Sequence, residues 1–267
     1  MAPGLPTPSA PQLLRDWASR GRYHFSTEDV AEELGISLTA ARSALRRLKK
    51  KGLVASPYRG FHVQVPPEHQ RLGCLPADQF VPHLMNHLDV PYYAGLLTAA
   101  RYHGAAHQQP QVFQVVVPKN RPSIECGLVQ VWFVARHNAA TMPTTAVNTP
   151  RGPLDISAPE TTAYDLVGYP EHSGGLDNVA TVLAELGEKL DPGRLLEIAD
   201  LSPVPWSQRL GYILELVEHP LPSEPLARFV ADRAVETASL LTGAETSTAR
   251  RDQRWKLWIN ADLDPDL

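Results

Sequence analysis

The stretch SLTAARSALRRLKKKG, residues 37–52, decides the fold of the first part of the chain. At 3.6 residues per turn it predicts a helix with one narrow apolar face, formed by Leu38, Ala41, Leu45 and Leu48. Small polar and basic side chains fall on the opposite face. A helix that is packed on one side and basic on the other suits a DNA groove.

The residues before this helix predict two shorter helices and a tight turn. The first spans residues 11–20, with apolar side chains at helical spacing. Ser26 or Thr27 caps a second helix, whose first turn contains Glu28 and Asp29. Gly35 and Ile36 then turn the chain toward Ser37, which is the next N-cap candidate. Two short helices, a glycine turn and a longer basic helix indicate a helix-turn-helix.

The residues after Gly52 predict a β-hairpin. LVAS (53–56) and FHVQV (61–65) alternate apolar and polar side chains, and Pro57-Tyr58-Arg59-Gly60 between them has turn chemistry. A hairpin directly behind the recognition helix predicts a winged helix-turn-helix with Arg59 at the tip of the wing.

Charge supports a nucleic-acid interface in this part of the chain. Residues 1–65 contain ten Lys and Arg against five Asp and Glu, whereas the remainder carries a formal charge of -9. A solvated basic face on a protein-binding winged helix is the alternative. We expect DNA contacts from small or polar residues early in the helix, from basic residues later in it and from the wing. The candidate residues are Ser37, Thr39, Ala40, Arg42, Ser43, Arg46, Arg47, Lys49, Lys50 and Arg59.

Composition excludes several classes of protein. No run of about 18 apolar residues is long enough for a membrane span, so we expect no membrane partner. The Pro-rich start has neither a basic nor an apolar signal region, which favours a cytoplasmic protein, nucleoid-associated when bound to DNA. Cys74 and Cys126 lie far apart in sequence, and two free thiols are expected, with a structural disulfide as the alternative.

Pro66-Pro67 marks the predicted domain boundary. We expect a flexible arm over residues 1–10, a winged helix-turn-helix over 11–65 and a larger mixed domain over 66–267. In the larger domain, strands are expected first, at 112–117, 128–134, 143–149 and 152–157, and helices after them. The fold class is therefore α+β. RWKLWIN (254–260) is expected as a late strand that returns to the same sheet.

The larger domain contains no convincing catalytic or metal motif. His83/His87 and His103/His107 have the i, i+4 spacing of half a metal site, but no HExxH glutamate accompanies them. Asp155, Glu160 and Asp165 are scattered, and no P-loop, dinucleotide fingerprint or nucleophile elbow is present. We therefore expect no catalytic residues, metal or cofactor.

The most concentrated basic site of the larger domain is the loop Lys119-Asn120-Arg121. Lys119 and Arg121 are candidates for a second contact with DNA or with an acidic partner. An ordinary solvated turn is the alternative.

Several segments together resemble the AbiEi antitoxins of type IV toxin–antitoxin systems. They are the winged head, LLTAARYHGAAHQQPQVFQVVVPKNR (96–121) and SAPETTAYDLV (157–167). The resemblance implies a toxin partner of the AbiEii nucleotidyltransferase kind, neutralised directly or only functionally. It also implies autorepression by binding of the head to inverted repeats in the promoter of its own operon. Carried over residue by residue, the head role falls on Thr39, Arg42, Ser43, Arg46, Arg47 and Arg59.

Two other functions stay open at the level of sequence. One is a ligand-sensing winged-helix transcription factor with a C-terminal effector domain, and the other is an enzyme with a DNA-targeting head. No coiled coil or dimer helix is evident, so one monomer on each half-site is expected.

Overall fold

The computed structural model describes residues 9–105, 111–217 and 223–265. It divides into two compact units that interleave along the chain. Unit 1 comprises residues 1–92, 111–135 and 147–154, and unit 2 comprises 93–110, 136–146 and 155–267. The predicted arm lies mostly outside the described residues, and the first helix already begins at Ala10.

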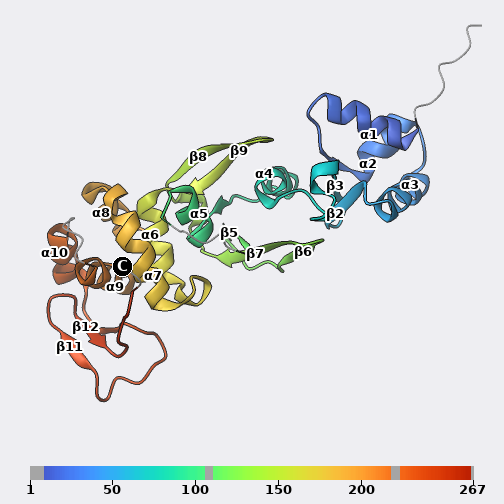
Figure 1. Cartoon of the computed structure of the whole chain (residues 1–267). Coiled ribbons are helices and arrows are strands. Elements are labelled where there is room, and N and C mark those ends of the chain that lie inside the picture. Colours follow the sequence, from blue (N-terminus) through green and yellow to red (C-terminus); the bar gives the residue numbers. More distant parts are fainter. Residues whose placement is uncertain (1–8, 106–110, 218–222, 266–267) are drawn as a thin grey trace, which may run out of the picture. The chain divides into compact units, whose positions relative to one another are not determined.

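Unit 1 begins with the predicted winged helix-turn-helix and continues with a further helix and three strands (Figure 1). Its elements are α1 (Ala10–Ser19), β1 (His24–Ser26), α2 (Thr27–Leu34), α3 (Leu38–Lys50), β2 (Val54–Tyr58), β3 (Phe61–Gln64), α4 (Ala77–His87), β5 (Phe113–Val117), β6 (Ile124–Cys126) and β7 (Val129–Ala135). Strands β1, β3 and β2 form an antiparallel sheet in that order. Strand β7 pairs in parallel with β5 and antiparallel with β6. Strands β1 and β6 were not predicted, because three-residue strands carry too little alternation to be recognised.

Two hydrophobic cores hold unit 1 together. The first joins the three N-terminal helices around Trp17, Phe25 and Leu45. The second joins the wing residues Phe61 and Val63 to α4 and to strands β5–β7. The wing therefore has one face in a core with residues beyond 66, and the compact units do not divide at Pro66-Pro67. The span 11–65 remains our proposal for the DNA-binding segment.

Unit 2 is mainly helical. Its elements are β4 (Tyr93–Ala94), α5 (Leu96–Tyr102), α6 (Pro159–Gly168), α7 (Gly175–Leu186), α8 (Pro192–Asp200), α9 (Val204–Leu216), α10 (Ser223–Arg233), β10 (Ala238–Ser239), β11 (Arg250–Asp252) and β12 (Leu257–Ile259). Strand β4 pairs in parallel with β9 through Ala94 and Ile156. The hairpin β8 (Thr144–Thr149) and β9 (Gly152–Ser157) has its tip in unit 1 and its base in unit 2. Short single-turn 3-10 helices occur at Pro67–His69, Ala139–Thr141, Pro170–His172 and Gly187–Lys189. The predicted α+β class, with strands first and helices after, is confirmed.

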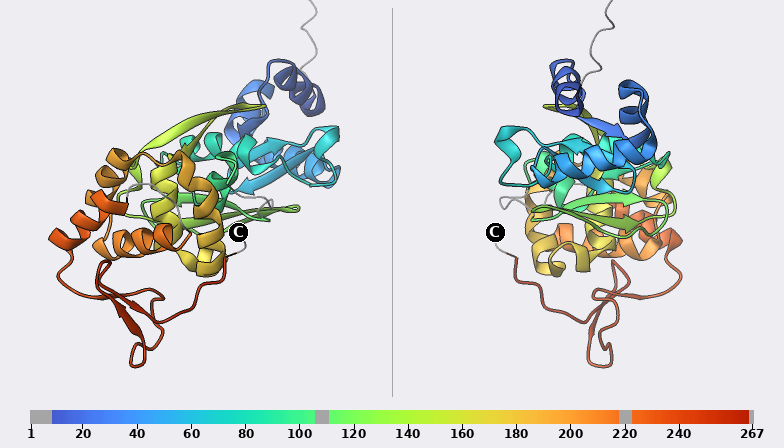
Figure 2. Two further views of the ribbon diagram at one scale, coloured as in Figure 1. Left: turned by 60° about the vertical axis from the view of Figure 1, so that its left-hand side comes forward. Right: turned by 90° about the vertical axis from the view of Figure 1, so that its right-hand side faces the viewer.

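The late strand was placed wrongly. Strand β12 lies at the centre of a separate three-stranded sheet, parallel to β10 and antiparallel to β11. Figure 2 shows this small sheet, in red, beside the helices of unit 2. Periodicity indicates a strand but does not identify the strands that pair with it. Here both neighbours of β12 are strands of the same C-terminal segment, β10 and β11. Trp255 anchors the segment: it is fully buried, and its indole N–H donates to Glu215 at 2.8 Å.

Candidate nucleic-acid interface

Capping residues fix where α2 begins, where it ends and where α3 begins. Ser26 and Asp29 form a capping box at the start of α2, and Arg22 holds the Asp29 carboxylate at 2.6 Å. Gly35 ends α2 with φ 59°, a left-handed conformation that suits glycine. The Ser37 hydroxyl accepts the backbone N–H of Ala40 at 3.2 Å and so caps α3, as predicted.

Helix α3 buries one face and exposes the other. The buried face consists of Ala41, Ala44, Leu45 and Leu48. Leu38 was predicted on this face and is instead 42% exposed, because it lies in the first turn, at the end of the packed stripe. The opposite face carries the candidate DNA contacts. Of the nine candidates on and before α3, only Ser43 is half-buried; the exposed ones are Ser37, Thr39, Ala40, Arg42, Arg46, Arg47, Lys49 and Lys50.

The wing is a tighter hairpin than predicted. Strand β2 extends to Tyr58 through a register shift after Ala55, so the turn consists of Arg59 and Gly60 alone. Gly60 has φ 80°, which a side chain would disfavour. Arg59 is exposed at the tip.

His62 ties the wing to the helix-turn-helix. Its Nε2 lies 3.0 Å from the Thr27 hydroxyl of α2, and its Nδ1 lies 2.9 Å from the Ser56 hydroxyl of β2. Burial lowers the pKa of His62, and the charge of Lys49 lowers it further. The neutral ring therefore braces the wing against α2, which holds Arg59 in a defined position.

Helix α4 and the tip of the β8–β9 hairpin complete unit 1 around the winged segment. His83 of α4 stacks on His24 of β1 with ring centroids 3.9 Å apart. The Arg151 guanidinium lies 3.3 Å from the ring centroid of Tyr23, and its Nε donates to Gln79 at 2.8 Å. These contacts fix residues beyond 66 to the predicted head.

The second basic site lies in the same unit. Lys119 is exposed and Arg121 is half-buried, and both lie in the connection between β5 and β6. Sequence analysis assigned them to the larger domain, whereas the structure groups them with α3 and the wing in unit 1.

The described histidines of the two predicted pairs lie next to aromatic rings, a cleft and a backbone carbonyl group. A cleft of about 560 Å³ in unit 1 is lined by His24, His83 and His87 together with Arg22 and Asn86. Burial and the neighbouring His83 lower the pKa of His24 to about 4. His103 lies 2.7 Å from the Ser157 carbonyl oxygen, and His107 lies outside the described residues. Within the described ranges, no three His, Cys, Asp or Glu side chains gather as metal ligands would.

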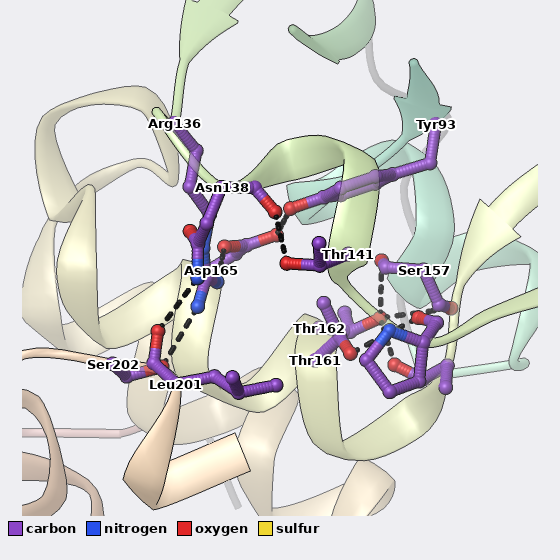
Figure 3. A network of polar contacts seen from close by, with 12 residues as sticks. Tyr93, Arg136, Asn138, Thr141, Ser157, Thr161, Thr162, Asp165, Leu201 and Ser202 are labelled. Carbon is purple, nitrogen blue, oxygen red and sulfur yellow. Dashed lines mark hydrogen bonds and ion pairs between the residues drawn. The ribbon is translucent and has the colours of Figure 1, made fainter. Parts of the chain in front are cut away.

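Unit 2 contains a buried polar network centred on Asp165 (Figure 3). Its carboxylate accepts a 2.5 Å bond from Arg136 and a 2.9 Å bond from the Tyr93 hydroxyl. Arg136 also donates to Asn138 at 3.0 Å and to Ser202 at 2.7 Å. Burial is the largest single influence and opposes the charge of Arg136, but the Asp165 carboxylate and the neighbouring tyrosines together outweigh it, so the pKa of Arg136 is raised.

The other polar residues of α6 are also turned inward. Every residue from Glu160 to Val167 is buried. The Thr162 hydroxyl donates to the Ala158 carbonyl oxygen at 2.9 Å and lies 2.7 Å from the Ser157 hydroxyl. Glu160 accepts the backbone N–H of Asp191 at 2.8 Å, whereas Asp155 is exposed. The three scattered carboxylates thus have three different surroundings.

Comparison with known proteins identifies the family. A model described as "Transcriptional regulator, AbiEi antitoxin" matches residues 12–61, which cover most of α1, all of α2, α3 and β2, and the first residue of β3. A model described as "AbiEi antitoxin C-terminal domain" matches residues 93–216. The chain belongs to the AbiEi antitoxin family. It is therefore a DNA-binding antitoxin of a transcriptional-regulator family, and the resemblance to AbiEi antitoxins predicted from its motifs is confirmed.

A solved structure shares the fold of this AbiEi family member. The crystal structure of the RV2827C protein from Mycobacterium tuberculosis matches with a TM-score of 0.66 and 18% sequence identity, covering 94% of each chain. At this identity the likeness concerns the fold alone. No curated protein matches the sequence. No helix in the described part of the chain is long and apolar enough to cross a membrane.

Sequence reasoning missed the partners of the AbiEi motif in α6. Asp165 was noted, but Arg136, Tyr93 and Ser202 lie far from it in sequence and were not connected with it. The available signal was Asp165 between Ala163-Tyr164 and Leu166-Val167, because a carboxylate among apolar neighbours needs a buried counter-charge.

Proposed function

We propose that this chain is the autorepressing antitoxin of a type IV system, and that it binds inverted repeats in the promoter of its own operon. Helix α3 enters the major groove, and Arg59 on the wing contacts the adjacent minor groove or its phosphates. Lys119 and Arg121 make a secondary contact with DNA. One monomer occupies each half-site.

The observation that carries this proposal is the exposed face of α3. Four of its basic residues, Arg46, Arg47, Lys49 and Lys50, are solvent-exposed on the side opposite the core. None of the four appears in a described ion pair, so their charge remains available for phosphates. The exposed small residues Thr39 and Ala40 in the first turn leave room for base edges.

Electrophoretic mobility shift with the DNA upstream of the gene tests this proposal. The double variant Arg46→Ala, Arg47→Ala should weaken operator binding by about 10- to 100-fold and lower the log–log salt slope by about 0.9 for each lost phosphate contact. The matched control is Arg250→Ala, Arg251→Ala, which removes an adjacent exposed arginine pair from β11 of unit 2. Equal loss in both double variants would indicate a general charge effect and would sink the assignment of α3.

We further propose that the chain counteracts an AbiEii-like nucleotidyltransferase toxin without catalysing a reaction itself. The segment matched by the antitoxin C-terminal domain model, residues 93–216, is the candidate for this activity. Co-expression with the neighbouring open reading frame, scored for growth, tests it. Growth should recover only when both genes are expressed. A neighbour that is not toxic, or is toxic regardless of this chain, would refute the antitoxin role in that operon.

One observation favours the alternative of a ligand-sensing regulator. The cleft lined by three histidines has a volume typical of small-molecule sites, at about 560 Å³, and it adjoins β1 of the DNA-binding segment. A small molecule that raises the melting temperature and changes operator affinity together would support this function. Operator binding that is independent of every compound that stabilises the protein would refute it.

A further inference from the structure

The two cysteines of the chain lie where two segments of unit 1 cross. Residues 72–74 run beside residues 126–128, and the Leu128 N–H donates to the Leu72 carbonyl oxygen at 2.7 Å. Next to Leu72 and Leu128 along the crossing lie Gly73 and Gly127. A Cβ placed on Gly73 would lie 3.2 Å from the Cα of Gly127, and one placed on Gly127 would lie 2.1 Å from the Leu72 oxygen. Only glycine permits so close an approach.

The next pair along the crossing is Cys74 and Cys126. Both are buried and free, and both belong to the second core of unit 1. The glycine pair brings the two backbones together directly beside them, and the two thiols are near enough to shift each other's pKa. A disulfide needs Cα atoms about 4.4–6.8 Å apart, which requires two backbones that run side by side, as these two do at Gly73 and Gly127.

The two thiols are not equivalent. The interaction with Cys74, which is the largest influence, acts together with the Ser56 backbone and the Lys49 charge; they outweigh burial and lower the pKa of Cys126 to about 7. The same pairing, together with burial, raises the pKa of Cys74. Cys126 is also the more accessible of the two, at 8% exposed against 0% for Cys74. Cys126 is therefore the thiol that ionises and reacts first.

We propose that Cys74 and Cys126 form a reversible intramolecular disulfide, a redox-modification site that lies directly against the wing. The oxidant is hydrogen peroxide. The Cys126 thiolate attacks one peroxide oxygen and breaks the O–O bond, which gives a sulfenic acid and hydroxide that is protonated to water. The Cys74 sulfur then attacks the sulfenic sulfur, loses its proton and releases water. Two thiols and one peroxide thus give one disulfide and two waters.

The position of the pair connects it to the candidate DNA interface. Cys126 lies on β6, which packs against β2 of the wing, the strand that contains Ser56. Ser56 also holds His62, the residue that braces the wing against α2. Oxidation removes the Cys126 thiolate charge beside β2 and ties the Cys126 sulfur to Cys74. We therefore expect it to shift the wing and to weaken operator binding severalfold; this consequence rests on the proposed function, whereas the disulfide itself does not.

The test titrates the reduced, folded full-length chain with hydrogen peroxide, alkylates the remaining thiols and measures intact mass. Both thiols should disappear together, with a mass lower by two hydrogen atoms, and dithiothreitol should restore them. The Cys74→Ala variant should instead accumulate sulfenic and sulfinic acid on Cys126, because its resolving thiol is missing. Cys126→Ala should leave Cys74 unreactive in the folded chain.

Three results would overturn the proposal. They are a disulfide that forms only in urea, oxidation of the two cysteines independently of each other, and a disulfide between two chains in place of one within a chain. Mobility shifts of the reduced and oxidised protein form a separate arm. If the disulfide forms and affinity is unchanged, the coupling to the wing is wrong. If neither form binds the upstream DNA, the operator function fails while the disulfide stands.

Discussion

Helices α3 and α6 are both rich in polar residues, and they use them in opposite ways. On α3 the polar and basic side chains lie on the exposed face, and the core is formed by Ala41, Ala44, Leu45 and Leu48. On α6 every residue from Glu160 to Val167 is buried; Asp165 bonds to Arg136 and Tyr93, Thr162 bonds to Ala158, and one carboxylate oxygen of Glu160 is left without a partner. The number of polar residues in a helix therefore does not indicate an interface. What distinguishes the two is whether the polar groups already have partners.

This difference separates binding from stability. Removing an exposed side chain without a partner leaves the folded state nearly unchanged and affects only what the protein binds. Removing one member of a buried network leaves the other without its partner, and the cost falls on folding. Variants of buried and of exposed polar groups should therefore fall into two classes, and four experiments test this on the two helices, on β1 and on the wing.

The largest effect is expected at the buried ion pair. Asp165→Asn leaves the Arg136 guanidinium, 3% exposed, without a counter-charge. We expect the free energy of unfolding to fall by about 3–5 kcal/mol in urea denaturation followed by circular dichroism. Arg228→Ala, which breaks an exposed pair with Glu224 on α10, should change it by less than about 1 kcal/mol. Equal effects of the two variants would mean that the Asp165 network contributes no more than a surface pair.

The next effect is a dependence on pH that originates in unit 1. The pKa of His24 is about 4 in the folded chain against 6.5 in the unfolded chain, so the unfolded chain binds the proton first as the pH falls. The neutral ring contributes fully above pH 6.5, and that contribution is lost as the pH falls from 6.5 to about 4. For this half-buried ring we expect a loss of about 2 kcal/mol after allowing for solvent screening.

Thermal denaturation between these pH values, compared with His24→Gln, measures this loss. His62 and His103 have pKa values lowered by burial and act in the same direction, so the variant should flatten the profile without abolishing it. An unchanged pH profile in His24→Gln would contradict the assignment.

A matched threonine pair compares the two helices directly. Thr162→Val on α6 removes hydroxyl contacts at 2.7 and 2.9 Å and should cost about 1–2 kcal/mol of unfolding free energy, with the Ser157 hydroxyl left short of a partner. Thr39→Val on α3 should change stability by less than about 0.5 kcal/mol and weaken operator binding. Denaturation and mobility shift of both variants measure the two quantities. The comparison fails if Thr39→Val destabilises as much as Thr162→Val.

The smallest effect is expected at the wing. Arg59→Ala removes one exposed charge from the hairpin tip and should lower the salt slope of operator binding by about 0.9, with no change in melting temperature. The control is Arg15→Ala on α1, also exposed in unit 1. If the two variants have the same salt slope, Arg59 makes no phosphate contact of its own.

The contacts that sequence could predict are those between neighbours along the chain. The amphipathic period of α3, the caps at Ser26 and Ser37 and the hairpin around Arg59 all depend on residues a few positions apart. Leu38 and the length of the wing turn were wrong in detail, because the end of a packed stripe and the exact register of a hairpin depend on neighbours from other elements.

The contacts that sequence could not predict join residues far apart in the chain. Arg136 meets Asp165, Arg151 covers Tyr23, and the segment before Cys74 crosses the one after Cys126. Composition and periodicity do not select these partners. Many arginines of the chain could pair with Asp165 or cover Tyr23, and the separation of the two cysteines in sequence does not show that their segments cross.

The sequence by itself therefore determined the winged helix-turn-helix, the α+β class and the AbiEi family, because these depend on local periodicity, capping and motifs. Only the tertiary structure decided that the wing shares a core with residues beyond 66, that the polar residues of α6 are buried, and that the two thiols meet. The physical reason is that burial and pairing are properties of which segments come together in space. A sequence encodes that choice through the whole fold and not through any single stretch.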